Sequence, residues 1–127
     1  MKKTVIKTQN APSAIGTYNQ ATEANGLIFT SGQISIDPTT GDMVKGGCKE
    51  QTDQILKNIN AILSSAGLDK THILKLTVFI TNLDWFSQVN DSFKEFFVDI
   101  EFPARSTVEV SALPMKALVE IECIASR

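Results

Sequence analysis

Two segments near the end of the chain alternate between apolar and polar residues, which is the pattern of strands that bury one face. In residues 105–112 the even positions are small or apolar, and in residues 118–126 the odd positions are apolar. The short connection of residues 113–117 favours an antiparallel pair. Paired residues point to the same side of a sheet, so this pairing predicts one face with an arginine and three carboxylates. The polar residues of that face would be Arg105, Thr107, Glu109, Glu120 and Glu122.

The first half of the chain predicts one hairpin and one long helix. Asn25-Gly26, the strongest short hairpin signal, separates residues 20–24 from residues 27–31. Apolar residues then recur at helical spacing and predict a helix over residues 48–66. They are Ile55, Ile59, Ile62, Leu63 and Ala66.

A strand and a second helix are expected next. Residues 73–81 are rich in β-forming residues. One face of this strand should hold Leu74, Leu76, Val78 and Ile80. The second helix is predicted to be capped by Asp84 and to end near Asp99. Its apolar stripe consists of Phe86, Val89, Phe93, Phe96 and Phe97.

These elements predict an α+β fold. A chain of 127 residues that is 43% hydrophobic and 20% charged builds one core, so we expect a single domain over residues 1–127. Two helices cover only one face of the sheet. The other face would carry Phe79, Leu118 and Ile124 among its charges, which suits neither solvent nor a core. We therefore expect a partner subunit, with Arg105 and the glutamates either at clefts between subunits or in weak surface ion pairs.

The charge balance and the N-terminus argue against several partners. Twelve Lys and Arg against 14 Asp and Glu give a net charge of −2 without a basic run, which argues against nucleic acid. The N-terminus lacks the apolar region of a secretory signal, and no apolar run approaches the about 20 residues of a membrane span. We expect a cytoplasmic protein with no membrane partner, in which Cys48 and Cys123 are reduced and serve packing.

The residues for metal or nucleotide chemistry are also missing. His72 is the only histidine, so neither a local zinc site nor a helical His pair can be assembled, and we expect a loop histidine. Neither G-x-x-x-x-G-K-[ST] nor G-x-G-x-x-G occurs. The sequence therefore predicts no metal and no cofactor.

Five segments are distinctive in sequence and in spacing. They are residues 14–21 (AIGTYNQA), 31–34 (SGQI), 89–90 (VN), 102–110 (FPARSTVEV), and 113–114 (LP) together with 119–122 (VEIE). In this order they resemble the RidA (YjgF) family of reactive-intermediate deaminases over almost the whole chain. One such segment would be weak evidence, whereas five at matching spacing are strong.

The resemblance implies a chorismate-mutase-like fold with a mixed, mostly antiparallel sheet and two helices on one face. It also implies a homotrimer whose sheets form a central barrel, with three clefts between subunits. The family hydrolyses 2-imino and 2-enamino acids, such as 2-iminobutanoate and 2-iminopropanoate, to 2-oxo acids and ammonia without a cofactor. Pyridoxal-phosphate enzymes that act on serine or threonine release these substrates.

The resemblance assigns roles to individual residues as well. Arg105 would bind the substrate carboxylate bidentately, and Glu120 would position or deprotonate the attacking water. Tyr18 matches a pocket tyrosine that closes over the substrate. The remaining substrate-binding positions are Ser31, Gly32, Asn90 and Thr107. Each of these residues also fits a structural role, as a loop anchor, a bulge or a solvated helix position.

Three positions depart from the family pattern. Thr17 and Asn19 flank the tyrosine where Pro and Ser are common, which puts the rigidity of this loop in doubt. Thr107 stands where many members have Cys, so thiol-based switching is not expected there.

Three classes of function remain open at this point. An imine hydrolase is favoured because both Arg105 and Glu120 are present. A regulatory protein that binds a 2-oxo acid in the same cleft would need only Arg105. An RNA-directed role is the least supported, because the chain is acidic and has no basic aromatic patch.

Overall fold

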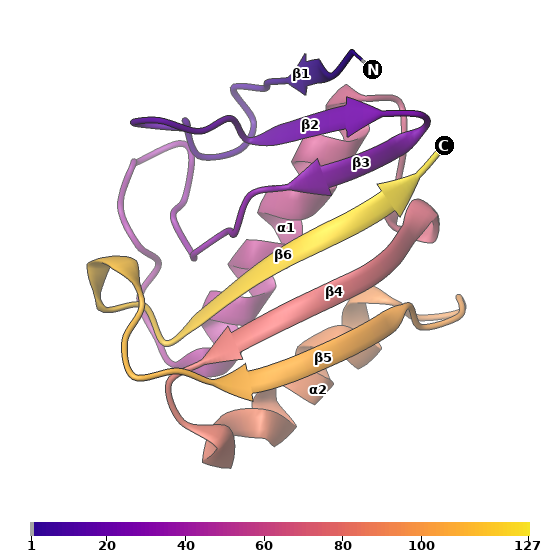
Figure 1. Ribbon diagram of the computed structural model, residues 1–127. Helices are drawn as coiled ribbons and strands as arrows, with labels where there is room; N and C mark the ends of the chain where they lie inside the picture. The colour runs from indigo at the N-terminus through magenta and orange to yellow at the C-terminus, as the bar shows by residue number, and fades with distance from the viewer. Residues whose placement is uncertain (1) are drawn as a thin grey trace.

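The computed structural model describes residues 2–127, and its two helices pack on one face of a six-stranded sheet (Figure 1). The strand order is β1-β2-β3-β6-β4-β5, and only β4 and β5 pair in parallel. In chain order the elements are β1 (Thr4–Ile6), β2 (Ala21–Ala24), β3 (Leu27–Thr30), α1 (Cys48–Ser65), β4 (Ile73–Ile80), α2 (Phe86–Phe96), β5 (Ala104–Glu109) and β6 (Val119–Ser126). This architecture confirms the predicted α+β class with a mixed, mostly antiparallel sheet.

The hairpin of β2 and β3 is confirmed at its predicted turn. Ala24 pairs with Leu27, which leaves Asn25 and Gly26 as a two-residue loop. Both loop residues have positive φ angles, 53° and 78°, as the type I′ turn requires. Asn and Gly tolerate this backbone better than other residues do, so the turn was readable from the sequence.

Helix α1 confirms the predicted helix over residues 48–66 to within one residue. The carboxylate of Glu50 accepts a hydrogen bond from the backbone N–H of Gly47 at 2.7 Å, which caps the first turn. The helix ends before Gly67, whose φ of 78° reverses the chain. Its buried face packs on the sheet through Ile55, Ile59, Ile62 and Leu63.

Strand β4 occupies the predicted segment, but one residue of its predicted face is wrong. The register shifts between Ile73 and Lys75, so the alternation breaks at the start of the strand. As a result Ile73 is buried and Leu74 is 51% exposed. Leu76, Val78 and Ile80 face the core as predicted.

Helix α2 lies where it was predicted, but its cap is different. A short 3-10 turn, Leu83–Trp85, precedes the helix. The side chain of Asn82, not that of Asp84, caps this turn by accepting a hydrogen bond from the Asp84 N–H at 2.9 Å. Any of several short polar side chains can cap a helix, and the extra turn moves the cap toward the N-terminus.

The predicted pairing of the last two strands is wrong. Strand β4 lies between β5 and β6 and pairs with both of them. The chain returns from β4 through α2, so β5 runs parallel to β4 at the edge of the sheet, whereas β6 enters the centre. Strands that follow one another in sequence are neighbours only about two-thirds of the time, and the pattern of alternation does not reveal the exceptions.

This topology also overturns the predicted common face. Arg105 pairs with Leu76 and Thr107 with Val78, so both lie on the face that the helices cover. Glu120 pairs with Phe79, and Glu122 with Thr77, on the opposite face. Arg105 and Glu120 therefore project from opposite sides of one sheet.

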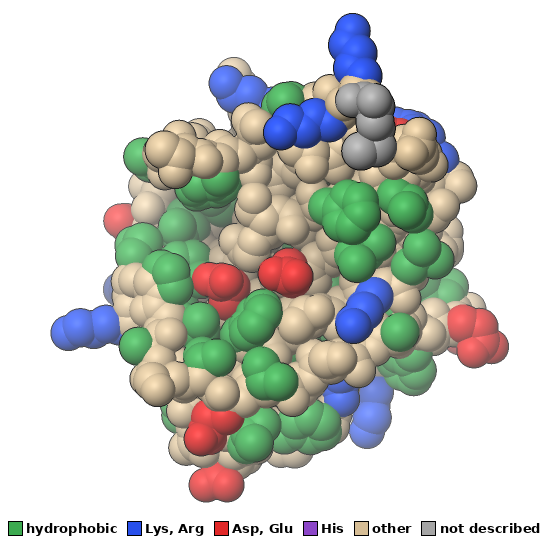
Figure 2. Space-filling model, in the orientation of Figure 1, with side chains coloured by type: hydrophobic (Ala, Val, Ile, Leu, Met, Phe, Trp, Pro, Cys, Tyr) green, Lys and Arg blue, Asp and Glu red, His purple; other side chains and the backbone are tan. Residues whose placement is uncertain are grey.

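The face without helices is apolar in large part, as predicted. It carries Phe79 and Ile124, together with Phe29, which is 46% exposed, and Val108, which is 44% exposed. Figure 2 shows hydrophobic side chains gathered around acidic ones on this side of the molecule. We refer to it below as the open face.

Candidate functional site

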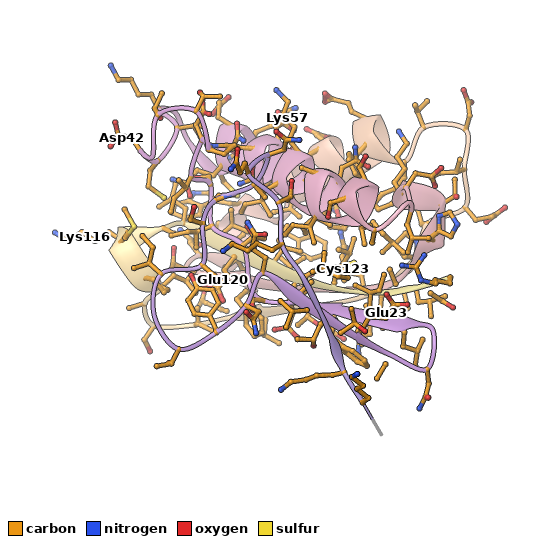
Figure 3. All side chains as sticks on the ribbon, turned by 90° about the horizontal axis from the view of Figure 1, so that it is seen from above. Glu23, Asp42, Lys57, Lys116, Glu120 and Cys123 are labelled. Carbon is orange, nitrogen blue, oxygen red and sulfur yellow. The ribbon has the colours of Figure 1, made fainter. Side chains whose placement is uncertain are left out.

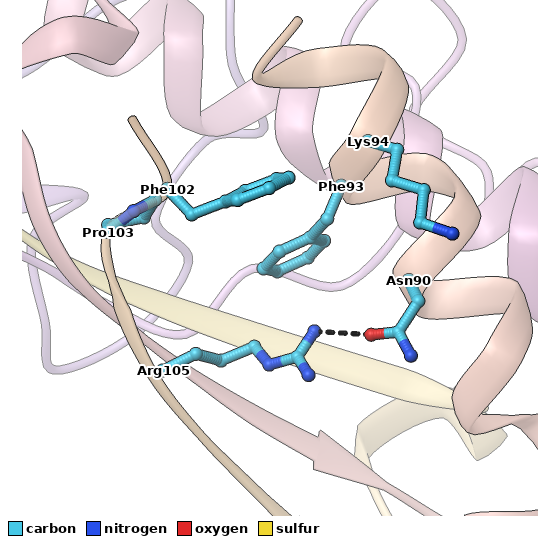
Figure 4. Close-up of a pocket in the computed structure, with 6 residues that line it drawn as sticks. All are labelled: Asn90, Phe93, Lys94, Phe102, Pro103 and Arg105. Carbon is cyan, nitrogen blue, oxygen red and sulfur yellow. Dashed lines mark hydrogen bonds between the residues drawn. The ribbon is translucent and has the colours of Figure 1, made fainter. Parts of the chain in front are cut away.

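The side chain of Arg105 is fixed by neutral partners. Its Nη1 atom donates a hydrogen bond to Oδ1 of Asn90 in α2 at 2.8 Å (Figure 4). The guanidinium carbon lies 4.9 Å from the ring centroid of Phe86 and 5.1 Å from that of Phe93. No carboxylate of residues 2–127 lies within ion-pair distance of the guanidinium. The charge is thus held in place without being neutralised.

A cavity of about 370 Å³ opens next to this guanidinium. Its lining consists of Asn90, Phe93, Lys94, Phe102, Pro103 and Arg105 (Figure 4). Burial lowers the pKa of Arg105, but arginine remains protonated at every physiological pH. A partly desolvated cation without an acidic partner is suited to bind an anion. We call this the Arg105 cavity.

A second cavity, of about 490 Å³, contains Glu120 and is called the Glu120 cavity below. Its lining consists of Pro12, Ser13, Ile15, Tyr18, Ser31, Gly32, Gln33, Ile34, Ile36, Pro114, Met115 and Glu120. Burial raises the pKa of Glu120, and the nearby charge of Glu122 raises it further. Figure 3 shows the molecule from above, so that the sheet is seen along its edge, with the helices on one side of it and Glu120 labelled.

Gly32 leaves room for the Glu120 carboxylate. A Cβ atom at position 32 would lie 2.8 Å from Cδ and 3.1 Å from Cγ of Glu120, closer than side-chain carbons normally approach. A side chain at position 32 would therefore displace the Glu120 carboxylate from the place that it occupies.

The loop that carries Tyr18 is tied to the sheet at Ser31 and Gln20. Oγ of Ser31 donates a hydrogen bond to the carbonyl oxygen of Asn19 at 2.6 Å. The buried amide of Gln20 accepts from the N–H of Thr8 at 2.7 Å and donates to the carbonyl oxygen of Pro12 at 2.8 Å. These bonds fix the loop and leave Tyr18 51% exposed at the cavity wall.

Thr107 carries a buried hydroxyl without a partner. It lies two residues beyond Arg105 on the same face of β5. Its Oγ1 atom is inaccessible to solvent and has no hydrogen-bond partner among the described residues. Such an atom costs free energy unless a ligand or another chain supplies a partner.

The predicted site residues thus divide into two groups. Arg105, Asn90 and Thr107 lie on the helix-covered side. Tyr18, Ser31, Gly32 and Glu120 surround the other cavity. Sequence reasoning missed Gln20 as the loop anchor, and it treated Phe86 and Phe93 only as parts of an apolar stripe. Their spacing from Asn90, four residues before and three after, was the signal that they share its side of the helix.

The two cysteines and the histidine do not line either cavity. Cys48 and Cys123 are free and buried, which confirms their packing role, and burial raises the pKa of Cys123 to about 12. His72 sits in the turn before β4, where its Nδ1 atom accepts a hydrogen bond from the Asp69 N–H at 3.1 Å.

Residues 2–127 contain no cluster of three potential metal ligands among His, Cys, Asp and Glu. Within the same residues, no helix is both long and apolar enough to cross a membrane.

Known proteins resemble this chain along nearly its full length. The sequence model of a family described as Endoribonuclease L-PSP matches residues 8–127. A RutC family protein of Pyrococcus horikoshii is 48% identical over 97% of this chain and 97% of its own. The 2-iminobutanoate/2-iminopropanoate deaminase of Bos taurus is 46% identical, with 95% of this chain and 88% of the bovine protein covered.

Solved structures share the fold. YyfA of Yersinia pestis, a protein of the conserved Rid family, superposes with a TM-score of 0.96 at 57% identity, covering 99% of this chain and 100% of that chain. Escherichia coli TdcF, crystallised with bound serine, gives a TM-score of 0.93 at 42% identity, covering 98% of each chain. On the match of the family model and on these relatives, the chain belongs to the RidA/YjgF family, as its five motifs predicted.

Proposed function

We propose that this protein hydrolyses 2-imino and 2-enamino acids, derived from serine or threonine by pyridoxal-phosphate enzymes, to 2-oxo acids and ammonia. The observation that carries the proposal is the guanidinium of Arg105, which is fixed by Asn90 in an open cavity and has no acidic partner among residues 2–127. A planar guanidinium binds a carboxylate through two parallel hydrogen bonds, and every 2-imino acid carries a carboxylate. Arg105 is therefore the proposed anchor, and relatives named as deaminases support the reaction.

We propose further that the complete site forms between subunits of a homotrimer. Arg105 and Glu120 project from opposite faces of the sheet, so one chain holds two half-sites. The apolar residues of the open face need a cover, and a second copy of the sheet supplies one. In such a trimer the Arg105 cavity of one subunit meets the Glu120 cavity of the next, which gives three equal clefts.

Glu120 is the proposed acceptor for a proton of the attacking water. The water oxygen adds to the imine carbon, and one proton passes through the carboxylate to the substrate nitrogen. In the tetrahedral adduct the hydroxyl proton then moves to the same nitrogen, and collapse of the adduct breaks the carbon–nitrogen bond, releases ammonia and leaves the 2-oxo acid. The raised pKa of Glu120 brings this base closer to the pH at which it works, which favours proton transfer in both directions.

The other residues shape the pocket. Tyr18 is exposed at the rim and is proposed to cover the substrate. Ser31 and Gly32 form the wall beside Glu120, whereas the hydroxyl of Thr107 is shut off from solvent beside Arg105 and lies outside the lining of the Arg105 cavity. No step requires a metal or a cofactor, because the imine is already electrophilic.

A coupled assay that generates 2-iminobutanoate tests the proposal. We expect imine decay to be faster with the protein than without it, and Arg105→Ala to abolish the acceleration while the fold is retained. Arg105→Lys should restore little, since a lysine lacks the two-pronged donor. Arg127→Ala is the matched control. Arg127 forms an ion pair with Glu23, with 2.6 Å between Nε and Oε2, and neither residue lines either cavity. Normal rates in Arg105→Ala would contradict the anchor.

Binding of a 2-oxo acid without turnover is the second candidate function. The crystal structure of TdcF with bound serine favours it, because an amino acid occupies that relative without being an imine. The same assay separates the two candidates. Tight binding of 2-oxobutanoate without any acceleration of imine decay would replace the hydrolase by a binding protein.

A further inference from the structure

Two phenyl rings of α2 lie against the guanidinium of Arg105. Phe86, Asn90 and Phe93 occupy positions i, i+4 and i+7, so they share one face of the helix. All three contact the same group, with ring centroids at 4.9 Å and 5.1 Å and an amide oxygen at 2.8 Å. We call Phe86 and Phe93 the aromatic pair.

The aromatic pair differs from the carboxylate that supports Arg127, the other arginine of the chain. Arg127 donates hydrogen bonds to the two carboxylate oxygens of Glu23 at 2.6 Å and 3.0 Å, and this carboxylate neutralises its charge. A phenyl face attracts a cation through its quadrupole without supplying a negative charge. The guanidinium of Arg105 is therefore oriented, partly desolvated and still available to an anion.

Core packing alone does not explain Phe86. Phe93 is 4% exposed and belongs to the core, where it packs edge-on to Phe97 at 5.8 Å. Phe86 is 37% exposed, so a large apolar side chain is kept at the surface beside the cation. Its contact with Arg105 gives a reason for this exposure.

We propose that Phe86 and Phe93 are positioning residues, which hold the Arg105 guanidinium in the orientation that binds a ligand carboxylate. Asn90 occupies one of the five N–H donors, and the rings occupy none, so the other donors remain free for the ligand. A side chain that is already ordered loses less rotational freedom when it binds. The aromatic pair thus raises affinity for the carboxylate without touching the reacting atoms. This inference rests on the proposed function of Arg105 as the anchor.

Phe86→Leu and Phe86→Trp test the role of the ring. Leucine keeps the apolar bulk and loses the π face, whereas tryptophan keeps and strengthens it. We expect Phe86→Leu to raise the Kd for 2-oxobutanoate and the KM for the imine by about 3- to 30-fold with little change in kcat. Phe86→Trp should stay near the wild type. Because Phe93 is buried, its substitution risks the fold, so the conclusion depends on Phe86.

Phe96→Leu is the matched control. Phe96 lies on the same helix, and the ammonium of Lys70 lies 5.2 Å from its ring centroid. Phe96 therefore also supports a cation, but it does not line the Arg105 cavity. We expect its Kd and KM to stay within about twofold of the wild type. Equal losses in Phe86→Leu and Phe96→Leu, or equal losses in Phe86→Leu and Phe86→Trp, would overturn the role of the ring.

A spectroscopic measurement tests the aromatic pair without any ligand. The Nε–H signal of Arg105, assigned by its disappearance in Arg105→Lys, should be shifted by the ring currents of the two phenyl groups. Phe86→Leu should reduce that shift and speed exchange of the proton with water. An unshifted wild-type signal would overturn the inference, even if the protein proves to be a hydrolase. Conversely, a shifted signal in a protein that neither binds 2-oxobutanoate nor hydrolyses the imine would refute the proposed function and, with it, the ligand role of the pair.

Discussion

The Arg105 cavity and the Glu120 cavity are built from different kinds of structure. Regular elements, β5 and α2, supply the hydrogen bond and the ring contacts that fix Arg105. The Glu120 cavity is lined mainly by loop residues, Tyr18 and Met115 among them. Met115 has a φ of 55°, an uncommon value for a residue that is not glycine.

This difference suggests a division of labour between the two half-sites. Orientation of a carboxylate needs a rigid cation, and a helix packed on a strand provides it. Admission of water and contact with a substrate involve side chains at the rim of a cavity, and the loops place Tyr18 there. Because Arg105 and Glu120 project from opposite sides of one sheet, the proposed reaction needs a neighbouring subunit to bring the two half-sites together.

The largest expected effect separates ligand binding from turnover. Arg105→Ala should weaken the affinity for 2-oxobutanoate by at least about 100-fold, which corresponds to the loss of two charge-assisted hydrogen bonds. Glu120→Gln keeps the shape of the side chain and loses the base, so kcat should fall about 100-fold with little change in that affinity. Calorimetry beside the coupled assay measures both quantities. If both variants lost binding equally, Glu120 would support the ligand and the water would need another acceptor.

Mixed subunits should recover part of the lost activity. In a trimer that contains both Arg105→Ala and Glu120→Gln chains, one cleft of three receives an intact Arg105 and an intact Glu120. Free mixing makes three-quarters of the trimers mixed, which predicts about one-quarter of the wild-type rate. The rate is measured after the two variants are unfolded and refolded together. Arg105→Ala mixed with Arg105→Lys is the control that should gain nothing, and no gain in the first mixture would place the site within one chain.

A methyl group at position 32 should disturb the Glu120 cavity and leave the Arg105 cavity unchanged. The added Cβ of Gly32→Ala would force the carboxylate of Glu120 to move, because it would lie 2.8 Å from its Cδ atom. We expect kcat to fall about 10- to 100-fold, since a misplacement of about 1 Å has that scale of effect. The affinity of Gly32→Ala for 2-oxobutanoate should stay close to that of the wild type. Gly47→Ala is the control, because its nearest neighbour would be 3.7 Å away; a full rate in Gly32→Ala would show that Glu120 tolerates displacement.

The smallest expected effect is a change in the pH profile. The pKa of Glu120 is raised above its ordinary value, first by burial and then by the charge of Glu122. Protonation of the base should therefore lower kcat/KM as the pH falls through a value above 4.5. Glu122→Gln removes one negative charge, which lowers the pKa of Glu120 and moves this acid limb to lower pH.

The control for this profile is Glu101→Gln, which changes the net charge equally at an exposed position. Rates are measured against pH for both variants at one ionic strength. A limb that moved equally in the two variants, or toward higher pH in Glu122→Gln, would mean that a group other than Glu120 controls it.

Local patterns determined most of the secondary structure. The hairpin turn at Asn25 and Gly26, the apolar spacing of α1 and the alternation of β6 each depend on a few neighbouring residues, and the structure confirms them. The errors lie where a local rule has several solutions. Asn82 replaces Asp84 as the cap, and a register shift exposes Leu74.

The residues of the candidate site could be named from the sequence, because the five motifs carry them. Their arrangement could not. Alternation tells which residues of a strand share a face, but it does not tell which strand lies beside it or which face the helices cover. The insertion of β4 between β5 and β6 decided that Arg105 lies under α2 and Glu120 on the open face. This choice depends on the return of the chain through α2 and on which face of the sheet the two helices cover, so only the tertiary structure could settle it.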